Sequence, residues 1–278
     1  MKRPRRSLPL QTRVARTPVG VSIVILFALV AISGPYLAPY DPASIDLRHQ
    51  YEPPSAAHPF GTGDNGVDIL SVILHGARLA GVVGLLVVGI SLALGTLVGI
   101  VAGYRGGASD HVVTGVADLV QAFPAIVLNI AILALVARPG LEHLVLALAV
   151  NGWVLYARIA RAQTLTIREM EYVQAARALG LREHRILARH VLPNLGGPLV
   201  VQATSGLGAV ILAESTLSFL GLGPGTTASW GALLDQGSAV LLRFPHVALF
   251  AGGTIAITVL GFNLAGDWLR DRLDPRSR

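Results

Sequence analysis

The sequence contains no cysteine, and Lys2 is the only lysine among its 278 residues. Without cysteine the chain has no disulfide, no thiolate nucleophile and no cysteine-based metal site, so its redox compartment is not indicated. Lys2 lies outside any glycine-rich motif, which excludes a P-loop lysine and a Schiff-base lysine. The chain therefore lacks a nucleotide-hydrolysing site of the usual P-loop kind.

Charge is also scarce. Only 14% of the residues are charged, against about 25% in soluble domains, while 53% are hydrophobic and the mean hydropathy is +0.61. The apolar residues form blocks close to the length of about 20 residues that crosses a bilayer as a helix. The chain is therefore predicted to be a polytopic all-α membrane protein. Its net charge of +6 lies in the loops between these blocks, which argues against nucleic-acid binding.

Six transmembrane helices are predicted. They cover roughly residues 18–37, 77–102, 112–136, 141–159, 196–219 and 245–265. This divides the chain into a basic N-terminus (1–17), a first transmembrane helix (18–37), an external segment (38–76), a five-helix core (77–266) with a loop at 160–195, and a charged tail (267–278). A basic segment before an apolar run also fits a signal peptide. An uncleaved anchor is preferred, because no clear A-x-A site follows and five more spans do.

Local patterns refine this outline. Pro124 predicts a kink in the third span, since a proline frees a backbone carbonyl inside a helix. Gly95, Gly99 and Gly103 allow close helix packing in lipid. Residues 68–76 are compatible with a short interfacial helix before the second span. The glycine-rich stretch at 221–231 predicts a flexible outer turn rather than a phosphate loop, because it has no lysine.

The orientation follows from the distribution of Arg and Lys. Eighteen of these residues fall in segments 1–18, 104–111, 158–193 and 267–278, whereas four fall on the opposite side of the predicted spans. Cytoplasmic loops carry the excess of positive charge. Both termini and the 160–195 loop are therefore predicted to be cytoplasmic, which an even number of spans also requires.

The 160–195 loop contains two short helical patterns. Thr166 and Glu169 have capping-box spacing, and Val173, Ala176 and Leu179 recur every three residues to give one small apolar face. Gly180 suits the left-handed conformation that ends a helix. A second helix begins near Arg182 and is expected to end at Leu192-Pro193, because the residue before a proline is disfavoured in the helical region.

This loop resembles the EAA loop of bacterial ABC-importer permeases in its Ala175-Ala176, Gly180 and Leu192-Pro193 spacing. Two residues depart from the family pattern: Gln174 stands in place of Glu, and His190 in place of an apolar residue. The sequence RHVLPN (189–194) is similar to the ending found in the peptide and nickel subfamily. Segments 58–78, 118–124 and 213–223 also resemble segments of that subfamily, in the same order.

The resemblance implies a type I ABC importer permease fold with six transmembrane helices, like the second permease of dipeptide, oligopeptide or nickel systems. The loop would then be a coupling helix that inserts into an ATPase subunit. The implied partners are a second homologous permease, two ATP-binding cassette subunits that use ATP and Mg²⁺, an extracytoplasmic binding protein and membrane lipid; no cofactor is expected on this chain. The implied coupling residues are Tyr172, Gln174, Ala175, Ala176, Arg177, Leu179, Gly180, Leu192 and Pro193. On composition alone, an ordinary basic loop held by phospholipid is the alternative.

Ionisable and amide groups inside the predicted spans are candidates for a translocation path, because such groups are costly in lipid. They are Asp118, Asn129, Asn151 and Glu214. The alternative is that they pair within the helix bundle, which is favoured for Asp118. The eight histidines show no paired ligand spacing, so no metal site is expected.

The sequence thus predicts the permease subunit of an ATP-driven peptide importer in the bacterial cytoplasmic membrane, and not an enzyme. A nickel or other small-solute importer is the alternative. A secondary transporter would need paired discontinuous helices and intramembrane ion ligands, for which one proline-interrupted span and two acidic residues give little support. An intramembrane hydrolase would need a catalytic motif, and none is present.

Overall fold

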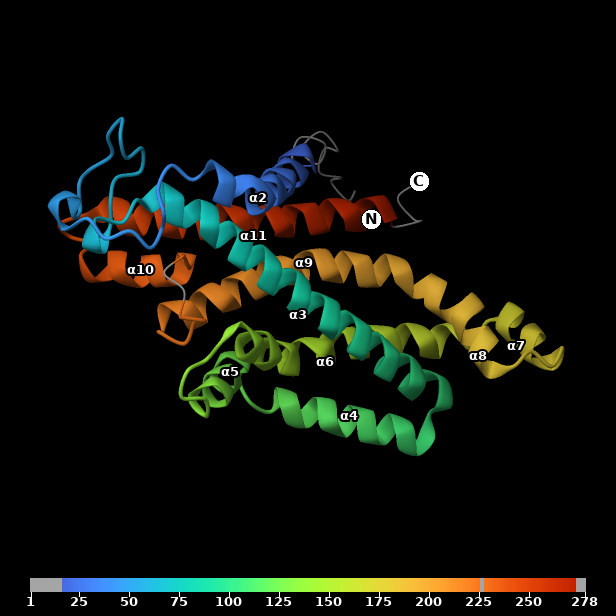
Figure 1. Ribbon diagram of the computed structural model, residues 1–278. Helices are drawn as coiled ribbons and strands as arrows, with labels where there is room; N and C mark the ends of the chain where they lie inside the picture. The colour runs from blue at the N-terminus through green and yellow to red at the C-terminus, as the bar shows by residue number, and fades with distance from the viewer. Residues whose placement is uncertain (1–16, 226–227, 274–278) are drawn as a thin grey trace, which may run out of the picture.

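The computed structural model describes residues 17–225 and 228–273, and it is an elongated bundle of helices (Figure 1). Five helical stretches are long and apolar enough to cross a membrane. They are α2 (Thr17–Leu37), α3 (Ile69–Arg105), α6 (Leu141–Ile167), the stretch Glu183–Phe219 that contains α9 (Leu192–Phe219), and α11 (Pro245–Leu273). The basic N-terminal segment up to residue 16 and the end of the predicted tail, 274–278, lie outside the described residues.

The third predicted span is broken rather than kinked. It consists of α4 (Gly107–Gln121) and α5 (Ala125–Ala134), which are bent by 82° at the residues between them. Pro124 sits at the N-cap of α5 with ψ of 129°, and a proline cannot donate the backbone hydrogen bond that would continue α4. Counted as one bent span, this pair brings the total to six, as predicted.

The core of the bundle is the seam between α3 and α6, which cross closely along most of their length. A Cβ atom at Gly99 would lie 2.9 Å from Ala157 Cα, and one at Gly103 would lie 2.8 Å from the Arg161 carbonyl oxygen. Side chains at these positions would force the helices apart, so the predicted use of the glycine repeat for close packing is confirmed.

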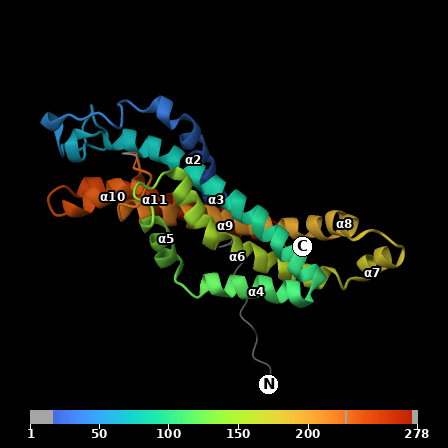
Figure 2. The same ribbon diagram turned by 60° about the horizontal axis from the view of Figure 1, so that its bottom comes forward.

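The connecting segments gather at the two ends of the bundle (Figures 1 and 2). The helices α7 (Glu171–Ala178) and α8 (Glu183–Ile186) lie at one end, while α10 (Trp230–Ala239) and the 38–68 segment lie at the other. The expected interfacial helix at 68–76 is instead the first two turns of α3, because Asp68 caps that helix by accepting a hydrogen bond from Ser71 N at 2.8 Å.

The 38–68 segment is folded against α11. Tyr51 stacks on Phe244 with ring centroids 4.7 Å apart, and Phe60 stacks on Phe250 at 4.3 Å. His246 Nε2 lies 3.1 Å from the carbonyl oxygen of Thr62. The segment therefore forms a fixed cover over this end of the bundle.

The helix α10 was not predicted, and the expectation of a flexible outer turn over the whole of 221–231 is wrong. Trp230 is buried, with 2% of its surface exposed, and its Nε1 donates to the carbonyl oxygen of Ile73 at 2.9 Å. Gly231 is also buried, and a Cβ atom there would overlap the carbonyl oxygen of Ser215. The second half of the stretch is therefore closely packed against α3 and α9.

Candidate coupling site and buried polar groups

The helix α7 is separated from α6 by a short turn. The predicted capping box at Thr166 is wrong, because α6 continues to Ile167 and the Thr166 hydroxyl donates back to the Ala162 carbonyl oxygen at 3.3 Å. A threonine inside a helix can make this bond to the residue four positions earlier. Met170 is the N-cap residue of α7, and its side chain makes no capping hydrogen bond.

Gly180 ends α7 as predicted. Its φ is +79°, which glycine adopts without the penalty that a Cβ atom brings. Leu181 N donates to the Ala176 carbonyl oxygen at 3.1 Å, and Gly180 N donates to that of Arg177 at 3.0 Å. These two bonds define a Schellman motif. A Cβ atom at Gly180 would have open space around it, since no described atom beyond the neighbouring residues in the chain lies within 4 Å.

The predicted apolar face of α7 is divided between two environments. Val173 is fully buried and Ala176 is 8% exposed, and both pack in a cluster with Ile186 and Val191. Leu179, in contrast, is 81% exposed. The three residues therefore do not form one continuous exposed face, because Val173 and Ala176 hold α7 against its own chain.

The exposed surface at α7 includes five of the candidate coupling residues. They are Tyr172, Gln174, Ala175, Arg177 and Leu179, all of them exposed. Gln174 Nε2 donates to the Glu169 carbonyl oxygen at 3.2 Å, and Arg177 Cζ lies 5.3 Å from the ring centroid of Tyr104. These contacts orient two side chains of the exposed surface.

Arg168 fixes the turn between α6 and α7. Its Nη1 donates to the Gly103 carbonyl oxygen at 2.8 Å, and its Nε donates to Glu169 Oε1 at 3.0 Å. The carbonyl groups at the end of a helix lack partners within that helix. Arg168 supplies one at the end of α3, and so links α3 to the base of α7.

Leu192-Pro193 does not end the second helix, contrary to expectation. The chain from Glu183 passes through a π-helical turn, η3 (Leu187–Val191), and continues directly into α9. Leu192 N donates to the Leu187 carbonyl oxygen, five residues earlier. The wider turn accommodates Pro193, whose ring would clash with a carbonyl in regular α-helix. Leu192 and Pro193 are both exposed, and they are the first two residues of α9, the helix that spans the membrane.

The two departures from the family pattern lie in different helical segments of this loop. Gln174 is exposed on α7, whereas His190 is half-buried in η3. The His190 ring lies 5.9 Å from that of Tyr172. Asn194 Nδ2 donates to the His190 carbonyl oxygen at 2.6 Å and reaches the Tyr172 hydroxyl at 3.4 Å. His190 thus contacts α7 through an aromatic side chain.

Three of the four candidate translocation residues pair within the bundle. Arg158 Nη2 donates to Asp118 Oδ1 at 2.7 Å, which agrees with the favoured alternative for Asp118. Both side chains are at least half exposed. Asn151 Nδ2 donates to Asn129 Oδ1 at 2.7 Å and so joins α6 to α5. The structure does not bring these two pairs into one site with Glu214.

Glu214 is the most deeply buried of the four, with 1% of its surface exposed. Its Oε1 accepts hydrogen bonds from Ser218 at 2.8 Å and from Ser229 at 3.3 Å, and its Oε2 accepts one from Ser215 at 3.3 Å. Ser229 is the N-cap residue of α10. The carboxyl group therefore links α9 to α10. A serine directly before the run from Trp230 is an N-cap pattern, which could have located α10 in the sequence.

Two family models match the sequence. The first is described as binding-protein-dependent transport system inner membrane component and matches residues 95–278. The second is the N-terminal transmembrane domain of oligopeptide transport permease C and matches residues 19–54. The predicted resemblance to ABC-importer permeases is therefore confirmed.

Curated relatives align over almost the whole chain. The chain is 40% identical over 261 residues to the dipeptide transport system permease protein DppC of Alkalihalophilus pseudofirmus, covering 94% of this chain and 86% of that protein. It is 38% identical to the oligopeptide transport system permease protein OppC of Bacillus subtilis, covering 94% and 85%. It is 39% identical to the probable D,D-dipeptide transport system permease protein DdpC of Escherichia coli, covering 94% and 88%.

A solved structure also shares the fold. It is a chain from the crystal structure of an amino acid ABC transporter with histidines, with a TM-score of 0.56 and 17% identity, covering 72% of this chain and 94% of that one. At this level of identity the match supports the fold only. Together with the six spans, it confirms the predicted type I permease architecture.

Proposed function

We propose that this chain, which belongs to the family of binding-protein-dependent transport system inner membrane components, is the transmembrane permease subunit of an ATP-driven importer of peptides. The chain is a multi-pass inner-membrane protein and a non-catalytic permease subunit. The peptide substrate is supported by the relatives at 38–40% identity, whose names refer to dipeptide, D,D-dipeptide and oligopeptide transport.

The proposed orientation places α7 and both termini in the cytoplasm. Eighteen of the Arg and Lys residues lie on that side and four on the other, which is the bias that sets topology in membrane proteins. In this orientation α10 and the 38–68 segment face the outside, where a substrate-binding protein would dock. That the first helix remains uncleaved is part of the same proposal.

The proposed partners supply what this chain lacks. Because Lys2 is the only lysine and no P-loop motif is present, ATP and Mg²⁺ would be used by two separate ATPase subunits. A second homologous permease would complete the pore, and membrane lipid would surround both. No cofactor is expected on this chain.

The observation that carries the proposal is the geometry of α7. This helix projects from the end of the bundle, is seated on its own chain through Val173 and Ala176, and leaves its opposite surface exposed. The next helix in the sequence, α8, continues without a break into α9, which spans the membrane. A partner that moves α7 would therefore also move a transmembrane helix, which is the physical requirement for coupling two sites.

The test replaces Gly180 with leucine in the assembled transporter and measures ATP hydrolysis together with peptide uptake in proteoliposomes. The expected result is continued ATP hydrolysis with loss of uptake, because a left-handed conformation disfavours any Cβ atom and would alter the end of α7. Gly221→Leu is the matched control, since Gly221 also has positive φ (+77°) in open space but lies at the opposite end. Unchanged uptake with Gly180→Leu would contradict the coupling role.

The substrate is tested separately. Proteoliposomes containing the complete transporter and its binding protein are supplied with a labelled dipeptide, a labelled oligopeptide or Ni²⁺. ATP-dependent uptake of a peptide supports the proposal, and uptake of Ni²⁺ alone favours the nickel alternative. Uptake by this chain without any ATPase subunit would instead indicate a secondary transporter.

A further inference from the structure

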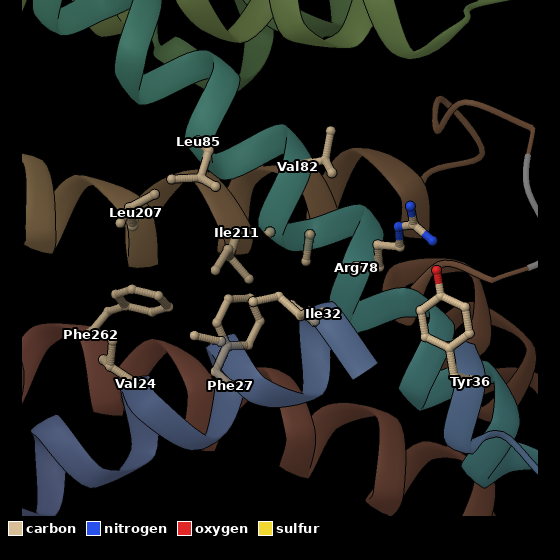
Figure 3. Close-up of a pocket in the computed structure, with 14 residues that line it drawn as sticks. Val24, Phe27, Ile32, Tyr36, Arg78, Val82, Leu85, Leu207, Ile211 and Phe262 are labelled. Atoms are coloured by element: carbon tan, nitrogen blue, oxygen red, sulfur yellow. The ribbon is translucent and has the colours of Figure 1, made fainter. Parts of the chain in front are cut away.

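An apolar groove lies between α2 and α3 and has a volume of about 500 Å³, within the range of small-molecule sites. Figure 3 shows Val24, Phe27 and Ile32 of α2 on one side and Val82 and Leu85 of α3 on the other. Ile211 of α9 and Phe262 of α11 lie between them. The groove is thus a crevice between the first helix and the core.

The crevice lies beside the contacts that hold α2 against the core. A Cβ atom at Gly261 of α11 would lie 2.8 Å from Ile23 Cβ, and the Phe27 ring lies 5.4 Å from that of Phe262. A Cβ atom at Gly20 would lie 2.7 Å from Ala265 N of α11, and one at Gly34 would lie 2.6 Å from the Leu74 carbonyl oxygen of α3. Between these contacts, Ala28 and Ala31 line the groove and are too small to fill it. The gap is therefore built into the sequence of α2.

The groove opens toward the lipid. Only 11% of the α2 span is buried within the protein, and Leu29, which neighbours the groove residue Ala28, is 59% exposed. An empty apolar gap on such a surface loses dispersion contacts. Water is a poor occupant of an apolar cavity, so an apolar chain is the favoured one.

One end of the groove carries a positive charge. Arg78 and Tyr36 line it there, and Figure 3 shows both at the end opposite Val24. Arg78 is exposed, and among residues 17–225 and 228–273 it makes no hydrogen bond or ion pair. Tyrosine and arginine at the end of a span are typical of the membrane interface, and a guanidinium group binds phosphate through parallel hydrogen bonds.

The length of the groove fits one leaflet. Val24 and Tyr36 are 12 positions apart on α2, which corresponds to about 18 Å along a helix. Half of the hydrocarbon core of a bilayer is about 15 Å thick. A lipid tail that enters beside Arg78 would therefore reach from the interface to the middle of the membrane within the groove.

We propose that the groove between α2 and α3 binds one membrane glycerophospholipid, with an acyl chain along Phe27 and Leu85 and the phosphate on Arg78. The lipid belongs to the leaflet on the side of the 38–68 segment. It fills the gap between the first helix and the core, and so supports α2 in its position. This inference requires only that the chain spans a membrane, and it is independent of the transported substrate.

The test uses the purified transporter complex and native mass spectrometry with added phosphatidylglycerol. Ala28→Trp places a large ring in the groove and is expected to abolish the lipid-bound species, whereas Leu29→Trp, on the neighbouring position that does not line the groove, is expected to retain it. Arg78→Gln is expected to weaken binding about fivefold, because one basic residue near the surface contributes roughly that factor. Arg138→Gln is the charge control.

Two results would overturn the proposal. Equal lipid binding by Ala28→Trp and Leu29→Trp would show that the groove is not the site. Loss of the second permease from the Ala28→Trp complex, with lipid binding unchanged, would show that a protein helix occupies the groove instead. Folding of each variant is verified by its elution as the intact complex, and the Arg78→Gln measurement remains decisive for the phosphate contact if Ala28→Trp fails to assemble.

Discussion

The two short helices at the ends of the bundle, α7 and α10, are attached to it in opposite ways. The helix α7 has two buried residues, Val173 and Ala176, and is otherwise exposed. The helix α10 is also short, but it buries Trp230, Gly231, Leu233 and Gly237, and it is linked to Glu214 through Ser229. The helix α7 is therefore held to its end of the bundle by few buried contacts, whereas α10 is held to the other end by many.

The difference indicates what each end can do. Elements with few buried apolar contacts open at low free-energy cost, whereas core elements open only with global unfolding. The α7 end can therefore shift against the bundle when a partner binds, while α10 stays attached to α3 and α9. The continuous helical stretch from α8 through α9 connects the two ends, so a displacement of α7 would reach the membrane span through the α8 end of this stretch, while its other end stays attached to α10.

The largest expected effect comes from removing the anchor of α10. Trp230→Ala deletes a buried ring and its hydrogen bond to Ile73, and we expect it to destabilise the protein by about 3–5 kcal/mol. The measurement is the midpoint of thermal unfolding in detergent. Trp268→Ala, on the half-exposed end of α11, is the control and should change the midpoint little. Equal shifts for the two variants would contradict the firm attachment of α10.

A smaller effect is expected from the polar link between α9 and α10. Glu214→Ala leaves three serine hydroxyls without their acceptor, and each buried unsatisfied group costs about 1–3 kcal/mol. We expect a net loss of about 2–3 kcal/mol, since serines can bond to carbonyls of their own helix. The matched variant Asp118→Ala breaks an exposed ion pair, which contributes about 0–1 kcal/mol.

Thermal unfolding and hydrogen exchange of α10 distinguish these two acidic residues. Glu214→Ala should lower the unfolding midpoint and increase exchange in α10, and Asp118→Ala should do neither. A larger effect of Asp118→Ala would mean that burial does not determine the contribution of an acidic side chain in this bundle.

The contrast between the two ends of the bundle also explains which structural features could be predicted from the sequence and which could not. The six spans and the turn at Gly180 depend on hydrophobic length and on backbone preference, which are local properties. The environment of α7 depends on contacts with Ile186 and Val191, and its periodicity cannot distinguish a face that packs inside the chain from one that meets a partner. Similarly, the continuation through Pro193 depends on a π-helical turn, for which the sequence carries no simple pattern.

The next prediction concerns the buried side chain of Val173, which holds α7 against its own chain. Val173→Ala removes two buried methyl groups, at about 0.8 kcal/mol for each buried carbon, so α7 should lose about 1.5 kcal/mol of local stability. Hydrogen exchange in 171–181 should increase by roughly tenfold, because 1.4 kcal/mol corresponds to a factor of ten, while α10 remains unchanged. Leu179→Ala, at an 81% exposed position, is the control. If Leu179→Ala increased exchange as much as Val173→Ala, burial of Val173 would not be what holds α7 against the bundle.

The smallest effect is expected from restoring the family glutamate at position 174. Gln174 is exposed, and its Nε2 donates to the Glu169 carbonyl oxygen at 3.2 Å, a bond that a carboxylate cannot donate. Glu169 and Glu171 are nearby in sequence, so Gln174→Glu also adds like charge, but exposed substitutions usually change stability by less than about 0.5 kcal/mol. The unfolding midpoint should therefore stay constant, and any change should appear in binding of the proposed ATPase subunit, measured by co-purification at low and high salt. An increase in hydrogen exchange of 171–181 comparable to that of Val173→Ala would show that the Glu169 bond, and not apolar burial, holds α7 against the bundle.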